Sequence, residues 1–197
     1  MGEIYFLKRF SEKRGDLYVI EESDDFSLRY KYYYIIRADH SNIVVKDPMS
    51  LLVLKGVVES GKCKVEKGTF ISDIYEIGNV SSDFIGLLLS NDRIAELGDV
   101  QINPGFEVKR IFFVDNMPVG AISGQHAHKT ETELLYVVAG EFNVNIKTES
   151  DTFSEILIKG QSVISLPMAW TSVENLTNKG LLLALLSHKY DKSGFII

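Results

Sequence analysis

The stretch that decides the fold runs from residue 120 to residue 140 and reads Gly120-Ala121-Ile122-Ser123-Gly124-Gln125-His126-Ala127-His128-Lys129-Thr130-Glu131-Thr132-Glu133-Leu134-Leu135-Tyr136-Val137-Val138-Ala139-Gly140. In an extended strand, side chains at positions i and i+2 leave the same face, so the imidazoles of His126 and His128 share one side. Glu133 follows after a turn and opens an apolar strand. Two imidazoles and a carboxylate inside a small barrel suit either a divalent metal or proton transfer.

Outward from this stretch the chain has the pattern of an all-β protein. Short runs rich in Ile, Val, Tyr and Phe are broken about every eight to twelve residues by Gly, Asn, Asp or Pro, which is typical of a sandwich or barrel. We therefore expect strands to dominate both halves.

The two halves of the sequence echo one another. Residues 67–72 resemble residues 159–165, and residues 85–90 resemble residues 183–187, in the same order along the chain. This predicts two β domains, residues 1–92 and residues 93–197, related by duplication. The alternative is that β sequences resemble each other through composition alone.

Composition excludes several classes of protein. The 197 residues are 45% hydrophobic and 24% charged, which is globular, and the net charge of −6 argues against nucleic acid as a partner. The single cysteine, Cys63, permits no internal disulfide, and the first nine residues do not form a signal peptide. The apolar runs are too short to cross a membrane. These observations predict a cytoplasmic protein.

The spacing from Gly120 through His126, His128 and Glu133 to Gly140 resembles the first motif of the cupin superfamily. The second cupin motif carries a further histidine, whereas residues 160–175 contain none. The resemblance thus implies a barrel with an incomplete metal cage, and we expect no cofactor. A metal held by His126, His128 and Glu133 alone is the alternative.

A more particular resemblance is to the sugar-nucleotide 3,4-ketoisomerases. It is carried by residues 109–114, 124–129, 135–140, 167–170 and 187–193, and it covers roughly residues 98–195. These are metal-independent cupins that act on thymidine-diphosphate 4-keto-6-deoxyglucose in pathways to bacterial surface glycans. The resemblance implies a cupin (jelly-roll) barrel in the C-terminal half, preceded by a degenerate cupin-like N-terminal half, and a nucleotide-diphosphate sugar as substrate.

Roles for individual residues follow from that chemistry. His126 and His128 are the expected acid/base pair, because imidazole titrates near neutral pH. Glu133, where the family commonly has Gln, is expected to orient one imidazole and raise its pKa. Two basic residues, Arg110 and Lys129, are candidate ligands of the diphosphate.

Trp170 is a candidate to stack on the base or sugar. Its alternative is a core or interface position, and the alternative for Arg110 is an exposed strand face.

The sequence also departs from the family pattern. Ser123 stands where family members have Arg, and Phe112 and Phe113 stand where they have Tyr. An enediolate intermediate needs donors near its oxyanion. A non-catalytic sugar-binding module and a metal-dependent cupin enzyme therefore stay open as alternatives, as do monomer and homodimer.

Overall fold

The computed structural model describes residues 3–23, 27–40, 43–60, 63–95, 97, 101–178 and 180–197. Across these residues the secondary structure is β-strand, with short 3-10 turns at Ala38–His40 and Lys192–Gly194 and no α-helix. The expectation of an all-β protein is confirmed. In the same ranges, no helix has the length and apolarity needed to span a membrane.

The chain divides into two compact units: Met1–Lys8 with Arg29–Asn103, and Arg9–Leu28 with Pro104–Ile197. This division differs from a boundary at residue 92. The reason is strand pairing, because β3 (Gly15–Glu21) lies beside β11 (Arg110–Asp115) in the second unit. Strand β10 (Gln101–Ile102) conversely lies beside β4 (Tyr32–Arg37) in the first.

The first unit is built on a six-stranded sheet in the order β1-β8-β5-β9-β4-β10, together with a β6-β7 hairpin. The bounds of its remaining strands are β1 (Ile4–Phe6), β5 (Ile43–Lys55), β6 (Val57–Ser60), β7 (Cys63–Glu66), β8 (Thr69–Ile77) and β9 (Ile85–Ser90). Its core is apolar and includes Leu51, Val53 and Leu88.

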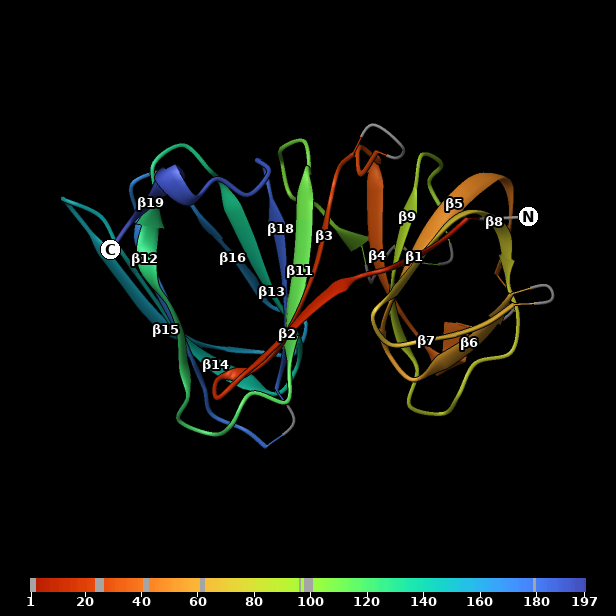
Figure 1. The fold of residues 1–197 in the computed structure, drawn as a ribbon, viewed down its shortest axis with the longest axis horizontal. Helices are drawn as coiled ribbons and strands as arrows, with labels where there is room; N and C mark the ends of the chain where they lie inside the picture. Colours follow the sequence, from red (N-terminus) through yellow and green to blue (C-terminus); the bar gives the residue numbers. More distant parts are fainter. Residues whose placement is uncertain are drawn as a thin grey trace. The chain divides into compact units, whose positions relative to one another are not determined.

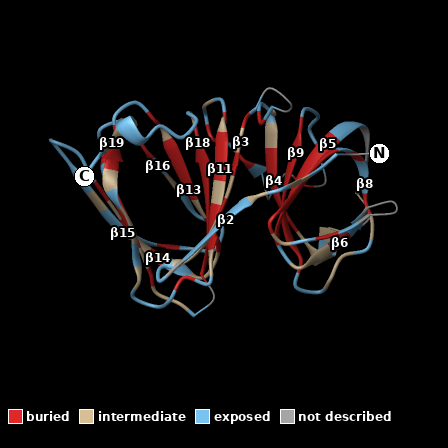
Figure 2. Ribbon diagram, in the orientation of Figure 1, coloured by how far each residue is buried: buried red, intermediate tan, exposed pale blue. Residues whose placement is uncertain are grey.

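The second unit has two sheets, in the orders β16-β13-β18-β11-β3-β2 and β15-β14-β17-β12-β19 (Figure 1). The strands not yet defined are β2 (Lys8–Glu12), β12 (Ile122–His128), β13 (Glu133–Ala139), β14 (Glu141–Lys147), β15 (Thr152–Ile158), β16 (Ser162–Ser165), β17 (Trp170–Asn175), β18 (Leu181–Leu186) and β19 (Phe195–Ile196). Both sheets contribute to one buried core, for example Val137 of β13 and Val144 of β14. The two-sheet arrangement is consistent with a cupin-like fold. Figure 2 shows that the buried residues lie mainly along the strands of the sheets.

The interior of the second unit changes from apolar to polar toward one end. Leu135 and Val137 of β13 belong to the core, and alternation places Glu133 on the same face. Register aligns Arg110, Leu186, Glu133 and Ser165 in one row across four strands. Because paired residues in an antiparallel ladder project to the same side, this row lines the polar end.

Candidate functional site

A bulge in β12 lies directly before the two histidines. Gly124 pairs with Ser172 and His126 pairs with Thr171, so Gln125 is the extra residue, and its φ is 61°. A carbonyl oxygen of the bulge, that of Gly124, accepts a hydrogen bond of 3.0 Å from His126 Nδ1. The expected sharing of one face by both imidazoles is observed.

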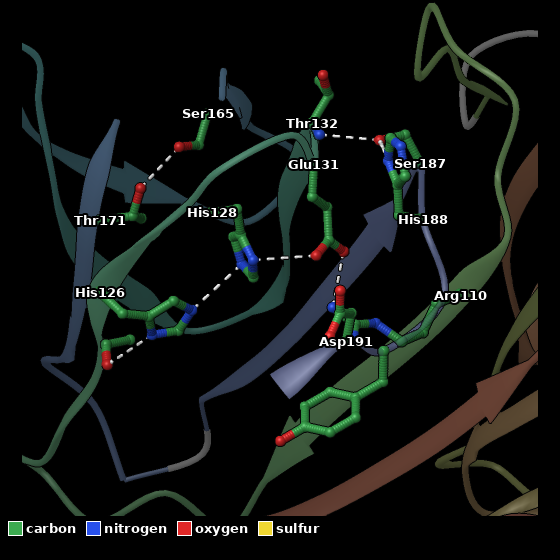
Figure 3. A network of polar contacts seen from close by, with 12 residues as sticks. Arg110, His126, His128, Glu131, Thr132, Ser165, Thr171, Ser187, His188 and Asp191 are labelled. Atoms are coloured by element: carbon green, nitrogen blue, oxygen red, sulfur yellow. Dashed lines mark hydrogen bonds and ion pairs between the residues drawn. The ribbon is translucent and has the colours of Figure 1, made fainter. Parts of the chain in front are cut away.

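The imidazoles are in direct contact (Figure 3). His126 Nε2 lies 3.2 Å from His128 Nε2, and the rings meet edge to face at a centroid distance of 4.7 Å. Burial lowers the pKa of His126. His128 itself is buried, with 7% of its surface exposed. His126 is the more exposed of the two rings, so it is the one that solvent or a ligand can reach more readily.

Glu131, which sequence reasoning missed, is the carboxylate that contacts the pair. Its Oε2 lies 3.0 Å from His128 Nδ1, and its Oε1 accepts a 2.7 Å hydrogen bond from Arg110 Nη2. Both side chains are buried. The loop is held by Thr132, whose N–H donates to Ser187 Oγ at 2.8 Å. The only sequence signal was an acidic residue three positions after His128.

Glu133 therefore has a different place from the one expected. Glu131, rather than Glu133, lies in hydrogen-bonding distance of an imidazole nitrogen. Glu133 is buried on the neighbouring strand, and burial raises the pKa of its carboxyl group from 4.5 to about 7. It is a second titratable group on the inner face.

Residues 187–197 cover the histidine pair. The ring of Phe195 lies with its centroid 4.8 Å from that of His126 and 4.9 Å from that of His128. β19 pairs with β12, and Lys129 Nζ donates to the Ser193 carbonyl at 2.7 Å. The N–H of Tyr190 donates to Glu21 Oε1 at 2.7 Å. Contacts from both β3 and β12 thus hold this segment over the site.

The candidate ligands of the substrate separate into two groups. Arg110 is inside the cluster, 5% exposed and paired with Glu131, so the expectation of an exposed strand face does not hold for it. Lys129 is engaged with Ser193 outside the cluster. Trp170 pairs with Ala127, and alternation puts it on the face opposite His126.

A metal site at the same place finds no support in the geometry. Throughout the described part of the chain, no three His, Cys, Asp or Glu side chains are grouped so that they could hold a metal ion. The alternative ligand set of His126, His128 and Glu133 is not assembled.

Comparison with known proteins places the chain in a family. The family described as "FdtA: WxcM-like, C-terminal" matches residues 82–197. The chain belongs to this family. The matched region of this WxcM-like chain includes the histidine pair, Glu131 and the covering segment, and it confirms the resemblance drawn from the motif. A comparison with curated proteins gave no match.

Solved structures similar to the WxcM-like chain include three described as 3,4-ketoisomerases. QdtA from Thermoanaerobacterium thermosaccharolyticum, in complex with TDP, is 23% identical over 46% of this chain and 67% of its own, with a TM-score of 0.44. WlaRA from Campylobacter jejuni, a TDP-fucose-3,4-ketoisomerase, is 17% identical over 75% and 87%, with a TM-score of 0.47. A 3,4-ketoisomerase from Helicobacter canadensis is 18% identical over 74% and 89%, with a TM-score of 0.45.

Proposed function

We propose that the protein is a nucleotide-sugar 3,4-ketoisomerase, or a close relative, that acts on a nucleotide-diphosphate 4-keto-6-deoxyhexose. The observation that carries this proposal is the contact between the partly buried His126 and the buried His128 imidazoles in a chain of the WxcM-like family. Bacterial surface-glycan synthesis is the expected setting, and no cofactor is required by the chemistry.

The reaction needs only proton transfers. A base removes the hydrogen on C3 as a proton, the C3–H electron pair forms a C3=C4 double bond, and the C4 carbonyl electrons move to its oxygen. The O3 proton then leaves, the C3 carbonyl forms, and the electrons of the double bond take a proton at C4, while the C4 oxygen is protonated. C3 is oxidised and C4 is reduced within one molecule. We assign these transfers to His126 and His128.

The enediolate oxygen also needs a donor, and Arg110 is the candidate. Among the described residues, its Nε–H is a buried donor with no hydrogen-bond partner. A buried N–H without a partner is costly, and a substrate oxygen would satisfy it. This donor would compensate for the polar side chains that are missing where Ser123 replaces the Arg and Phe112 replaces the Tyr of the family pattern. Phe113 is not involved, because it is fully buried and stacks on Tyr18 at a centroid distance of 4.6 Å.

The test is turnover of thymidine-diphosphate 4-keto-6-deoxyglucose in D₂O, followed by NMR. We expect deuterium at C4 of the 3-keto product and, through the reverse reaction, at C3 of the recovered substrate. His126→Asn and His128→Asn should each lower turnover by about a hundredfold or more and leave TDP affinity within a few-fold, since acid/base groups act mainly in the transition state. The matched control is His40→Asn, a histidine of the first unit.

Three outcomes would contradict the proposal. Tight TDP binding with neither turnover nor exchange would indicate a binding module. Loss of activity with a chelator would indicate a metal-dependent enzyme. Asn variants equal to the parent in turnover and affinity would remove the histidines from the site.

We also propose that the chain is a duplicated cupin-like protein, with a degenerate first unit. The strand order β8-β5-β9-β4 in the first unit parallels β16-β13-β18-β11 in the second. The resembling segments fall on corresponding strands: residues 67–72 and 159–165 reach β8 and β16, and residues 85–90 and 183–187 lie on β9 and β18. The apolar core of the first unit supports its lack of a site.

A further inference from the structure

The hydrogen-bond partners of the histidine pair determine where its protons lie. The Gly124 carbonyl can only accept, so His126 Nδ1, at 3.0 Å, must carry a proton. A carboxylate oxygen of Glu131 lies 3.0 Å from His128 Nδ1. Two facing lone pairs at this distance would repel, so His128 Nδ1 also carries a proton.

These two protons leave the Nε2 atoms facing each other. In a neutral imidazole with a proton on Nδ1, Nε2 has only a lone pair. The two Nε2 atoms lie 3.2 Å apart, at hydrogen-bonding distance. A hydrogen bond there needs one further proton, shared by the pair. We propose that Glu131 is a positioning residue that keeps this extra proton on His126 and His128, so that the pair consists of one imidazole and one imidazolium.

Arg110 has a defined part in this arrangement. A guanidinium stays charged at every relevant pH, and its Nη2 donates to Glu131 at 2.7 Å. Glu131 therefore bonds the fixed charge of Arg110 through Oε1 and faces His128 through Oε2. Because the Glu131 carboxylate lies 3.0 Å from His128 Nδ1, the extra proton resides mainly on His128.

Other titratable groups face the network from each neighbouring element. Glu133 comes from β13, and Glu21 of β3 lies 3.8 Å from Arg110 Nη1. The covering segment contributes Tyr190, whose ring lies 5.6 Å from the Arg110 guanidinium. These groups surround Arg110 and His128, and within the described ranges of the chain Glu131 is the residue that contacts both.

The consequence for the reaction rests on the proposed function. An isomerisation that removes a proton from C3 and delivers one to C4 needs a base and an acid at the same time. A pair with one shared extra proton holds both groups. When a substrate comes between the two Nε2 atoms, His126 Nε2 keeps the lone pair of a base and His128 Nε2 keeps the proton of an acid. Glu131 acts through His128, whose Nδ1 lies 3.0 Å from its carboxylate.

The experiment is ¹⁵N NMR of the protein with labelled histidine, titrated without substrate. In the parent we expect both Nδ1 atoms protonated and one further proton on the Nε2 pair at neutral pH. In Glu131→Gln the extra proton should be lost at a pH lower by about 1–3 units, because an opposite charge nearby is gone. Glu131→Asp should retain more of the parent behaviour. Glu155→Gln, which removes an exposed carboxylate from β15, is the control and should match the parent.

The parent spectrum alone decides the proton count, so the proposal stays testable even if Glu131→Gln does not fold. An unprotonated His128 Nδ1, or two neutral rings at neutral pH, would overturn the proposal. An unchanged titration in folded Glu131→Gln would do the same. Because the count needs no turnover, a protein that lacks isomerase activity but shows the shared proton would contradict the proposed function and leave this inference standing.

Discussion

Replacement of Glu133 by Gln should stabilise the protein at alkaline pH and have little such effect at acidic pH. The Glu133 carboxyl group is 6% exposed, and burial raises its pKa from 4.5 to about 7. The folded state therefore holds a proton on Glu133 over a pH range in which the unfolded chain has released it.

The sign and size follow from linkage. Between pH 4.5 and about 7 the native state binds more protons than the unfolded state, so the free energy of unfolding falls as the pH rises. At about 1.4 kcal/mol per pH unit, the full cost above this window is about 3 kcal/mol. Glu133→Gln removes this cost. Any penalty for burying the amide is independent of pH, so it cancels when two pH values are compared.

The assay is urea unfolding of parent and variant at pH 4 and pH 8. The stability difference, variant minus parent, should rise by about 3 kcal/mol between these two values. The exposed-site variant Glu155→Gln should show a difference that changes by less than about 0.5 kcal/mol. A Glu133→Gln difference that is the same at both pH values would refute the reasoning, since it would mean that Glu133 ionises normally in the folded protein.

Two further predictions concern the cover and the boundary. Phe195→Ala should make His126 and His128 react several-fold faster with diethylpyrocarbonate, at a stability cost below the roughly 3–5 kcal/mol of a fully buried Phe. Unchanged reactivity would mean that the segment does not limit access. A fragment of residues 104–197 should be much less stable than one that also carries residues 9–28 through a linker, because only the longer fragment retains β3. Equal urea midpoints for the two fragments would contradict the observed pairing.

Local periodicity accounts for what the sequence predicted correctly. The two histidines share a face because i and i+2 positions do so in any strand, and this holds even with a bulge just before them. Arg110 shows what strand periodicity cannot predict. Alternation assigned it to one face of a strand but could not tell the interior from the exterior, since that depends on what covers the strand.

Glu131 was missed because its position depends on contacts far apart in the sequence. It lies in a loop, where no periodicity applies, and the loop is held through Thr132 by Ser187, 55 positions away. Glu133 was preferred because it lies in the motif and begins a strand. Its position at the start of β13 buries Glu133, and this burial raises the pKa of its carboxyl group.

The domain boundary shows how non-local pairing reaches the site. β3 is nearly a hundred residues before β11, so no local pattern could connect them, yet its last residue, Glu21, approaches Arg110 and accepts from Tyr190. Arg110 in turn holds Glu131, and Tyr190 belongs to the segment that covers the histidines. Residues 9–28 thus contribute to the charge balance and to the cover of the site. It follows that a degenerate first half need not be dispensable, because part of it completes the unit in which proton transfer is proposed.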